Sequence, residues 1–153
     1  MILMFDVGNT ELKIAIAKNN EIVKKYRFRT NPDISDDEMY LSYYNIIKDY
    51  VFSHIIIASV VPSITLKLKN IAKKYFFINP LVLEQGTKTG LKIIADNPKE
   101  VGADLIACSV RASNLYQRSL VIDLGTAIKY LYVENKTLNG VIISPGIETS
   151  LNA

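Results

Sequence analysis

The chain of 153 residues has little of several features that mark special classes of protein. It has one cysteine, so no disulfide can form within it, and the apolar surroundings of Cys108 favour a buried thiol over a nucleophile. No apolar run approaches the ~20 residues that span a bilayer. No basic segment precedes the apolar N-terminus, as it would in a signal peptide. We therefore expect a cytoplasmic protein with no membrane partner.

Clusters of like charge are also scarce. The net charge of +3 comes from Lys and Arg residues that are scattered along the chain, so we expect no nucleic-acid partner. The single histidine, His54, has no metal-ligand residues beside it and is interpreted as structural or solvent-facing. What is present, 49% hydrophobic and 22% charged residues, is typical of an ordinary globular chain with a sizeable core.

The spacing of apolar residues predicts an α/β protein. Strands are predicted where apolar residues alternate or form short runs, and helices where they recur every three or four positions. The predicted strands are residues 2–5, 11–17, 22–28, 54–61 and 80–84, and the predicted helices are residues 39–50, 63–76 and one that starts at residue 103. The tyrosines of the first helix are interpreted as a face that packs on a sheet.

Two stretches of the chain share one plan. "MILMFDVGNTELKIAIAKNNEIVKKYRF" and "SLVIDLGTAIKYLYVENKTLNGVIIS" each run from an apolar strand through Asp-x-Gly, with a threonine close behind, into an alternating strand. Each then continues through an Asn-containing turn into a returning strand. We interpret this repeat as an internal duplication, which predicts two similar halves that each begin with a three-stranded meander.

The Asp-x-Gly turns suit a nucleotide phosphate. Glycine lets backbone N–H groups come close to a ligand, and Thr10 or Thr126 adds a hydroxyl. Because a carboxylate repels phosphate, Asp6 and Asp123 would hold a cation, or its waters, beside it. Two facing copies would then clamp a nucleotide between them. The structural alternative is that each aspartate bonds its own backbone in the turn.

A third candidate lies between the two repeats, in "DNPKEVGADLIACSVRASNLYQ". Asp104 falls in the first turn of the predicted helix, where an acidic side chain complements the helix dipole. The same carboxylate could instead act as a general base toward a substrate hydroxyl. The spacing of the residues leaves both interpretations open.

These segments resemble a known family. "DVGNT", "IIIASVVP", "KTGLKI", "DNPKEVGAD", "DLGTA" and "GVIISPGI", in this order, are similar to type III pantothenate kinase, also described as the Bvg accessory factor family. Asp-x-Gly-x-Thr alone is shared by the wider superfamily of acetate kinase, sugar kinases, Hsp70 and actin. The resemblance implies an α/β, ribonuclease H-like (actin-like ATPase) fold with ATP between two halves, and a homodimer.

The resemblance also implies an activity: ATP phosphorylates pantothenate to 4'-phosphopantothenate, the first step of coenzyme A biosynthesis. It implies ATP, Mg²⁺ and a monovalent cation, K⁺ or NH₄⁺, as cofactors. Asp104 would be the base, Asp123 would hold the monovalent cation, and Asp6 would face Mg²⁺ through water. The implied ATP-binding residues are Asp6, Val7, Gly8, Asn9, Thr10, Glu11, Leu12, Lys13 and Thr126, and the implied substrate-binding residues are Gly102, Ala103, Asp104 and Leu105.

The chain departs from the family pattern at three positions. Leu105 stands where an arginine is usual, Ala95 where a substrate-contacting tyrosine is usual, and Ile128 where a threonine is usual. An aliphatic Leu105 cannot replace the bidentate grip of a guanidinium on a carboxylate.

The repeat also predicts where the halves divide. We expect a complete first half over residues 1–117 and the start of a second, truncated half over residues 118–153. The alternative to the kinase is therefore a non-catalytic truncated remnant, or a nucleotide-binding module, of the same fold.

Overall fold

The computed structural model describes residues 1–84, 86–94 and 101–152. The chain divides into two compact units, Met1–Glu84 (unit 1) and Gln85–Ala153 (unit 2). Unit 1 contains β1 (Ile2–Val7), β2 (Glu11–Lys18), β3 (Glu21–Arg29), α1 (Asp36–Ile47), β4 (His54–Ser59), α2 (Pro62–Phe76) and β5 (Leu81–Leu83). Unit 2 contains β6 (Lys92–Ile93), α3 (Ala103–Leu115), β7 (Arg118–Leu124), β8 (Ala127–Glu134), β9 (Thr137–Pro145) and α4 (Ile147–Leu151).

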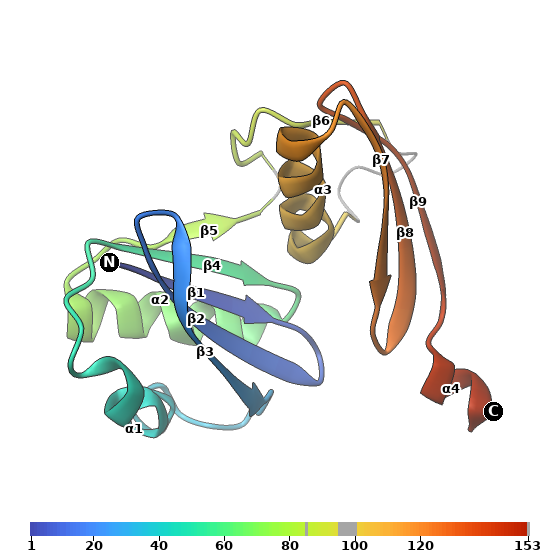
Figure 1. Ribbon diagram of the computed structural model, residues 1–153. Coiled ribbons are helices and arrows are strands. Elements are labelled where there is room, and N and C mark those ends of the chain that lie inside the picture. Colours follow the sequence, from blue (N-terminus) through green and yellow to red (C-terminus); the bar gives the residue numbers. More distant parts are fainter. Residues whose placement is uncertain (85, 95–100, 153) are drawn as a thin grey trace. The chain divides into compact units, whose positions relative to one another are not determined.

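The sheet of unit 1 has the strand order β3-β2-β1-β4-β5 (Figure 1). β1, β2 and β3 form an antiparallel meander, whereas β4 pairs parallel with β1 and β5 pairs parallel with β4. Asn19 and Asn20, both with positive φ, make the tight turn between β2 and β3, as asparagine tolerates this left-handed backbone better than most residues. The predicted meander is confirmed.

Local signals in the sequence fix the two helices of unit 1. α1 begins with a capping box, in which the Ser35 hydroxyl accepts a hydrogen bond from the Glu38 N–H and the Glu38 carboxylate accepts one from the Ser35 N–H. α2 begins at Pro62, whose fixed φ suits a first helical position and whose missing N–H is not needed there. α2 ends at Phe76 and is capped by Phe77, which has a left-handed φ of 56°.

The core of unit 1 lies between one face of the sheet and the two helices. Leu3, Phe5 and Val7 of β1 are almost fully buried, and so are the alternate residues of β2 that face the same way. Met39, Tyr43 and Ile47 of α1 and Ile64, Leu68, Ile71 and Ala72 of α2 are buried in the same cluster. A fully buried Leu, Ile, Val, Phe or Met side chain contributes about 1.5–3 kcal/mol when it leaves water. The meander therefore depends on its helices.

Unit 2 repeats the meander on a smaller scale. Its sheet has the order β6-β9-β8-β7, with β7, β8 and β9 antiparallel and β6 parallel to β9. Asn135 and Lys136, again both with positive φ, make the turn between β8 and β9. The β2–β3 ladder shifts register at Ile16/Ala17, and the β8–β9 ladder shifts at Tyr132/Val133. A shared turn and a shared bulge position support the predicted duplication.

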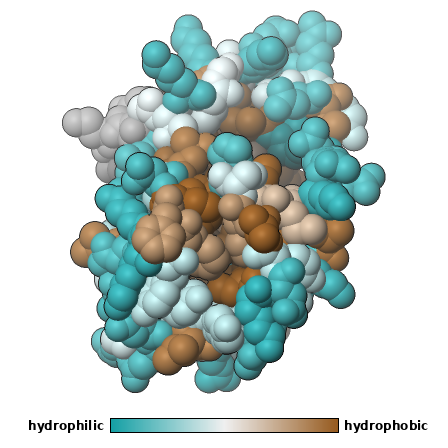
Figure 2. Space-filling view, turned by 90° about the vertical axis from the view of Figure 1, so that its left-hand side faces the viewer, coloured by the Kyte–Doolittle hydropathy of each residue, from teal (hydrophilic) through white to brown (hydrophobic). Residues whose placement is uncertain are grey.

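The two meanders differ in what covers the equivalent face. Leu120, Ile122 and Leu124 stand in β7 where Leu3, Phe5 and Val7 stand in β1, counted from the matched aspartates. The β1 residues are 0%, 4% and 1% exposed, but the β7 residues are 61%, 53% and 69% exposed. α3 packs on the other face of the unit 2 sheet, where Leu105, Leu131, Val133 and Leu138 form a small core. Figure 2 shows the face that lies on the left-hand side of Figure 1, where apolar side chains also gather.

The compact units do not divide where the repeat does. The repeat predicts a division at residues 117/118, whereas the contacts divide the chain at residues 84/85. The reason is that α3 packs on β7 and β8 and so belongs to unit 2. The division of the repeat itself stays a prediction. The two-residue β6 was not predicted, because so short a strand has no period to detect.

Candidate functional site

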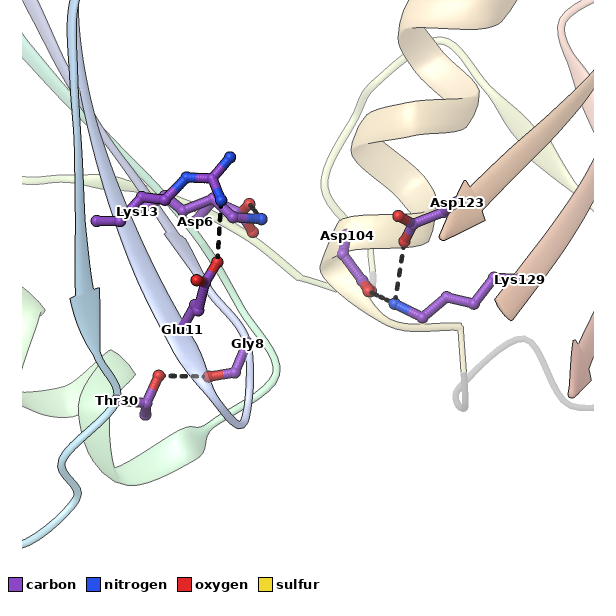
Figure 3. Close-up of polar contacts among 9 residues, drawn as sticks. Asp6, Gly8, Glu11, Lys13, Thr30, Asp104, Asp123 and Lys129 are labelled. Atoms are coloured by element: carbon purple, nitrogen blue, oxygen red, sulfur yellow. Dashed lines mark hydrogen bonds and ion pairs between the residues drawn. The ribbon is translucent and has the colours of Figure 1, made fainter. Parts of the chain in front are cut away.

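Asp6 lies near the end of β1, directly across the ladder from Lys13 of β2. The Lys13 Nζ atom is 3.3 Å from Asp6 Oδ2, and the two side chains are 48% and 51% exposed (Figure 3). So exposed an ion pair is held weakly, by about 0–1 kcal/mol. Both charged groups can therefore turn toward a ligand at little cost.

The loop that follows β1 is fixed from the end of β3. The Thr30 hydroxyl donates a hydrogen bond to the Gly8 carbonyl at 2.7 Å, and the Thr30 N–H donates one to the Thr10 carbonyl at 3.0 Å. The Gly8 N–H donates to the Glu11 carbonyl, so it is not itself a donor for phosphate. Asn9 and Thr10 are exposed and remain the candidates for contact with a ligand.

The other residues assigned to this loop by the resemblance lie in different environments. The side chains of Val7 and Leu12 are each 1% exposed and belong to the core, so they shape the loop from below. Glu11 is 3.8 Å from Arg27 of the neighbouring strand, and both side chains are exposed. Of the predicted ATP residues of unit 1, Asp6, Asn9, Thr10, Glu11 and Lys13 thus present exposed polar groups.

In unit 2 the structure brings together two of the predicted residues, Asp104 and Asp123. Asp104 lies in the first turn of α3, which starts after Gly102, and Asp123 lies near the end of β7. Lys129 of β8 is directly across the ladder from Asp123. Its Nζ atom donates to Asp104 Oδ2 and also lies 3.3 Å from Asp123 Oδ2 (Figure 3). The lysine therefore ties the strand to the helix.

This cluster is less exposed than the Asp6–Lys13 pair. The side chains of Lys129, Asp104 and Asp123 are 23%, 26% and 42% exposed. Partial burial lowers the pKa of Lys129, but the hydrogen bond and charge of Asp104, followed by those of Asp123, outweigh it and raise this pKa above its usual value. Lys129 is thus a fully protonated ammonium at neutral pH.

The turn after β7 is fixed by residues that follow β9. The Gly146 N–H and the Thr149 hydroxyl each donate a hydrogen bond of 3.0 Å to the Thr126 carbonyl. A side chain at Gly146 would overlap the carbonyls of Gly125 and Thr126, so this position has no room for a Cβ atom. The Gly125 N–H, like that of Gly8, is taken by a carbonyl two or three residues on. Thr126 is exposed, as a nucleotide contact would require.

Two of the predicted substrate residues are core residues. Ala103 is 6% exposed and Leu105 is 5% exposed, and Leu105 packs with Leu131, Val133 and Leu138. The side chain of Leu105 therefore faces the interior of unit 2. The departure at Ala95 lies outside the described residues.

Sequence reasoning did not identify Lys129, Thr30, Gly146 or Thr149 as parts of the site. One signal could have found the lysine. Lys13 and Lys129 stand opposite Asp6 and Asp123 in their ladders, so the repeat aligns the lysines as well as the aspartates. The roles of Thr30, Gly146 and Thr149 depend on where the third strand of each meander ends, which periodicity does not define.

A pocket of about 350 Å³ lies elsewhere in unit 1, between the start of α2 and the ends of β4 and β5. Ser59, Pro62, Thr65, Lys69 and Leu83 are among its lining residues. None of the residues predicted from the sequence lines it. The chemistry of the strand ends, rather than this hollow, therefore defines the candidate site.

The oxygen, nitrogen and sulfur donors of the site determine which metal ions it could hold. Within residues 1–84, 86–94 and 101–152, no group of three or more His, Cys, Asp or Glu side chains could hold a metal ion. The exposed carboxylate of Asp6 suits a water of the Mg²⁺ that a nucleotide brings with it as substrate. Asp123 does not fit a resident monovalent cation, because the Lys129 ammonium already lies beside its carboxylate. In the same described part of the chain, no helix is both long and apolar enough to cross a membrane.

Comparison with solved structures identifies the fold. A Baf family transcriptional activator from Campylobacter jejuni has a TM-score of 0.56 and 19% identity, covering 95% of this chain and 55% of that chain. A Ppx/GppA phosphatase from Aquifex aeolicus has a TM-score of 0.57 and 13% identity, covering 96% and 53%. An N-acetylglucosamine kinase from Porphyromonas gingivalis has a TM-score of 0.54 and 13% identity, covering 93% and 47%. The predicted α/β fold of the actin-like ATPase and sugar kinase type is confirmed.

Comparison with sequences gives the family. The chain is 43% identical over 153 residues to a type III pantothenate kinase of Acholeplasma laidlawii and 38% identical over 165 residues to one of Halalkalibacterium halodurans. It spans 62% and 63% of the length of these relatives. A family model described as type III pantothenate kinase matches residues 2–153. The chain belongs to the type III pantothenate kinase family.

Proposed function

We propose that this chain carries the nucleotide-binding and base-bearing part of a kinase that transfers the γ-phosphoryl group of ATP to the primary hydroxyl of pantothenate. The product would be 4'-phosphopantothenate, the first intermediate of coenzyme A biosynthesis. The observation that carries the proposal is the cluster of Asp104, Lys129 and Asp123, which lies where β7 runs into the second Asp-x-Gly turn. Family membership supports the choice of substrate.

In this proposal Asp104 is the general base. Its carboxylate accepts the proton of the pantothenate hydroxyl while the oxygen forms a bond to the γ-phosphorus and the bond to ADP breaks. In unit 1, Asn9 and Thr10 would contact phosphates of ATP, and Asp6 would face a water of the Mg²⁺ that the nucleotide brings, which would neutralise charge on the phosphates. In unit 2, Thr126 would contact ATP, and Gly102 would line the substrate site.

We also propose a cytoplasmic homodimer. Apolar Leu120, Ile122 and Leu124 lie exposed on the unit 2 sheet, which favours association.

The second candidate function is a nucleotide-binding module without transferase activity. Leu105 favours it, because its side chain lies in the core and offers no positive charge to the carboxylate of pantothenate.

One pair of measurements separates the two functions. Calorimetry with a non-hydrolysable ATP analogue and Mg²⁺ reports nucleotide binding, and ADP release with pantothenate reports transfer. The kinase predicts both signals, with no ADP release when N-acetylglucosamine replaces pantothenate. Binding without pantothenate-dependent ADP release would support the module, and the absence of binding would contradict both.

A further inference from the structure

Lys129 has an unusual position between two acidic residues of different elements. It stands opposite Asp123 in the β7–β8 ladder, as Lys13 stands opposite Asp6 in the β1–β2 ladder. Both cross-strand pairs have a nitrogen to oxygen distance of 3.3 Å. Only Lys129 has a second carboxylate, that of Asp104 from the start of α3. The cross-strand aspartate–lysine pair thus occurs in both units, and in unit 2 the lysine also binds an aspartate of α3.

The second carboxylate changes what the lysine can do. Lys13 is about half exposed, so water competes for its ammonium, whereas Lys129 is 23% exposed and bonded on two sides. An ammonium has three N–H donors and no acceptor, so it can serve two carboxylates at once. Among the described residues, the Asp104 carboxylate has no other hydrogen-bond donor. Its orientation therefore depends on Lys129.

The same position is unsuited to a bound metal ion. A hard cation prefers six or more oxygen ligands, and here two aspartates share one ammonium. A further positive charge beside Asp123 would meet the positive charge of Lys129 at contact distance. The described part of the chain also offers no third carboxylate, imidazole or thiolate to this group.

We propose that Lys129 is the built-in cation of this site: its ammonium orients the Asp104 carboxylate against Asp123 and makes a bound monovalent cation unnecessary. Lys129 is a positioning residue in this proposal, since it acts on the base and not on the substrate. The catalytic part of the inference rests on the proposed kinase function. The structural part, the replacement of a bound cation by a lysine, does not.

The structural part is tested without any activity. Thermal unfolding is followed in choline chloride and in KCl or NH₄Cl of equal ionic strength, for the wild type, Lys129→Met and the control Lys73→Met. Lys73 is an exposed lysine of α2, so its loss changes the net charge equally. We expect the melting temperature of the wild type to be the same in all salts, and likewise that of Lys73→Met. Lys129→Met should melt about 2–4 °C lower in choline and recover in part with K⁺ or NH₄⁺.

Two results would overturn the proposal. A wild type that is stabilised by K⁺ or NH₄⁺, but not by choline, binds a monovalent cation despite Lys129. A Lys129→Met variant with wild-type stability in choline shows that the ion pairs of Lys129 with Asp104 and Asp123 do not stabilise the fold. If Lys129→Met does not fold, Lys129→Arg and Asp123→Asn replace it: the first keeps the charge and should stay insensitive to K⁺, and the second should lower the melting temperature in every salt.

The catalytic part is tested by pantothenate-dependent ADP release. We expect the wild-type kcat to change less than twofold when choline replaces K⁺. Lys129→Met should lose about 10-fold or more in kcat, with a smaller change in the KM for ATP, because a misplaced base slows the chemical step. A strong K⁺ requirement in the wild type would overturn the role of Lys129 and leave the kinase intact. No turnover in any salt would remove the kinase, while the thermal experiment would still decide the role of Lys129.

Discussion

Asp6 and Asp104 are both acidic residues of the predicted site, but their surroundings differ. Asp6 is half exposed with one lysine partner, whereas the side chain of Asp104 is 26% exposed and is held by Lys129 from the neighbouring sheet. A base needs a fixed direction toward the proton that it removes, and a metal-facing carboxylate needs access to water. The surroundings match the separate roles that we propose for the two residues.

Replacing Asp104 by asparagine tests the base. The change keeps the size of the side chain but removes the proton acceptor, so phosphoryl transfer to pantothenate should fall by ~10² to 10⁴. ATP binding, measured by calorimetry in the longest available form of the protein, should stay within a few-fold. Asp33→Asn, an exposed change outside the site, is the control. Unchanged turnover in Asp104→Asn would leave Asp104 only its interaction with the helix dipole.

Tyr43 gives a prediction about stability at high pH. Its ring packs against Phe5 and Phe28 in the core of unit 1, and burial raises its pKa from 10.0 to about 12. Because the folded state disfavours the phenolate, the contribution of Tyr43 to stability is constant well below pH 10 and declines as the pH rises from 10 through 12. At pH 11 the loss should be about 1.4 kcal/mol.

Urea unfolding of the wild type and Tyr43→Phe at pH 7 and pH 11 measures this effect. Phenylalanine keeps the ring and cannot ionise, so the variant should lose about 1.4 kcal/mol less than the wild type between the two pH values. Equal losses in both proteins would show that other groups cause the alkaline unfolding.

At the scale of elements, the two Asp-x-Gly turns are fixed by chain segments that follow the third strand. Thr30 holds the first turn, and Gly146 with Thr149 holds the second. In both units a threonine hydroxyl and a backbone N–H donate hydrogen bonds to carbonyls of the turn, and in unit 2 the backbone also approaches closely at Gly146. Each meander thus controls its own ligand loop.

Gly146→Ala should displace the second turn. Its φ of −68° suits any residue, so the effect is purely one of space: the new methyl group would overlap the carbonyls of Gly125 and Thr126. We expect MgATP to bind at least about 10-fold more weakly, which is 1.4 kcal/mol. Gly140→Ala in β9, where a methyl group meets nothing within 4 Å, should bind MgATP like the wild type. Normal binding by Gly146→Ala would separate this turn from the nucleotide.

The elements show which features the sequence can predict. Both meanders and the first three helices are found from local periods, and the Asn-containing turns identify the hairpins. The ends of elements are predicted less well: the acidic segment before Met39 indicates the first turn of α1, but the apolar spacing continues to Tyr50, whereas α1 ends at Ile47. The pairing of Lys129 with Asp104 is not a local property, because in the sequence Lys129 is one more polar residue of an alternating strand. The packing of α3 on unit 2, which creates that pair, is decided by tertiary contacts.

At the scale of the molecule, the repeat leaves one equivalent face covered in unit 1 and exposed in unit 2. Leu3 is fully buried under α1 and α2, while its counterpart Leu120 is 61% exposed. Three further large apolar side chains, those of Ile142, Ile122 and Leu124, are exposed by more than half. A surface of this kind favours association with another chain.

We expect the 153-residue chain to associate at micromolar concentration, most simply as a symmetric dimer that buries residues from about 119 to 153. Sedimentation of the wild type, Ile122→Glu and the control Leu41→Glu measures this. Leu41 of α1 is 64% exposed, so both changes replace an exposed aliphatic side chain with a carboxylate. Only Ile122→Glu should shift the chain to a monomer. A wild-type monomer in which Ile122 is shown to be exposed would contradict the prediction.

Mass spectrometry of pantothenate after incubation with MgATP and the purified protein decides whether this chain is a kinase. We expect a product that is heavier by one phosphoryl group, formed together with an equal amount of ADP. The same incubation with Asp104→Asn should give at most about one hundredth of that product. Unmodified pantothenate with a wild type that binds ATP, or equal product from both proteins, would contradict the account.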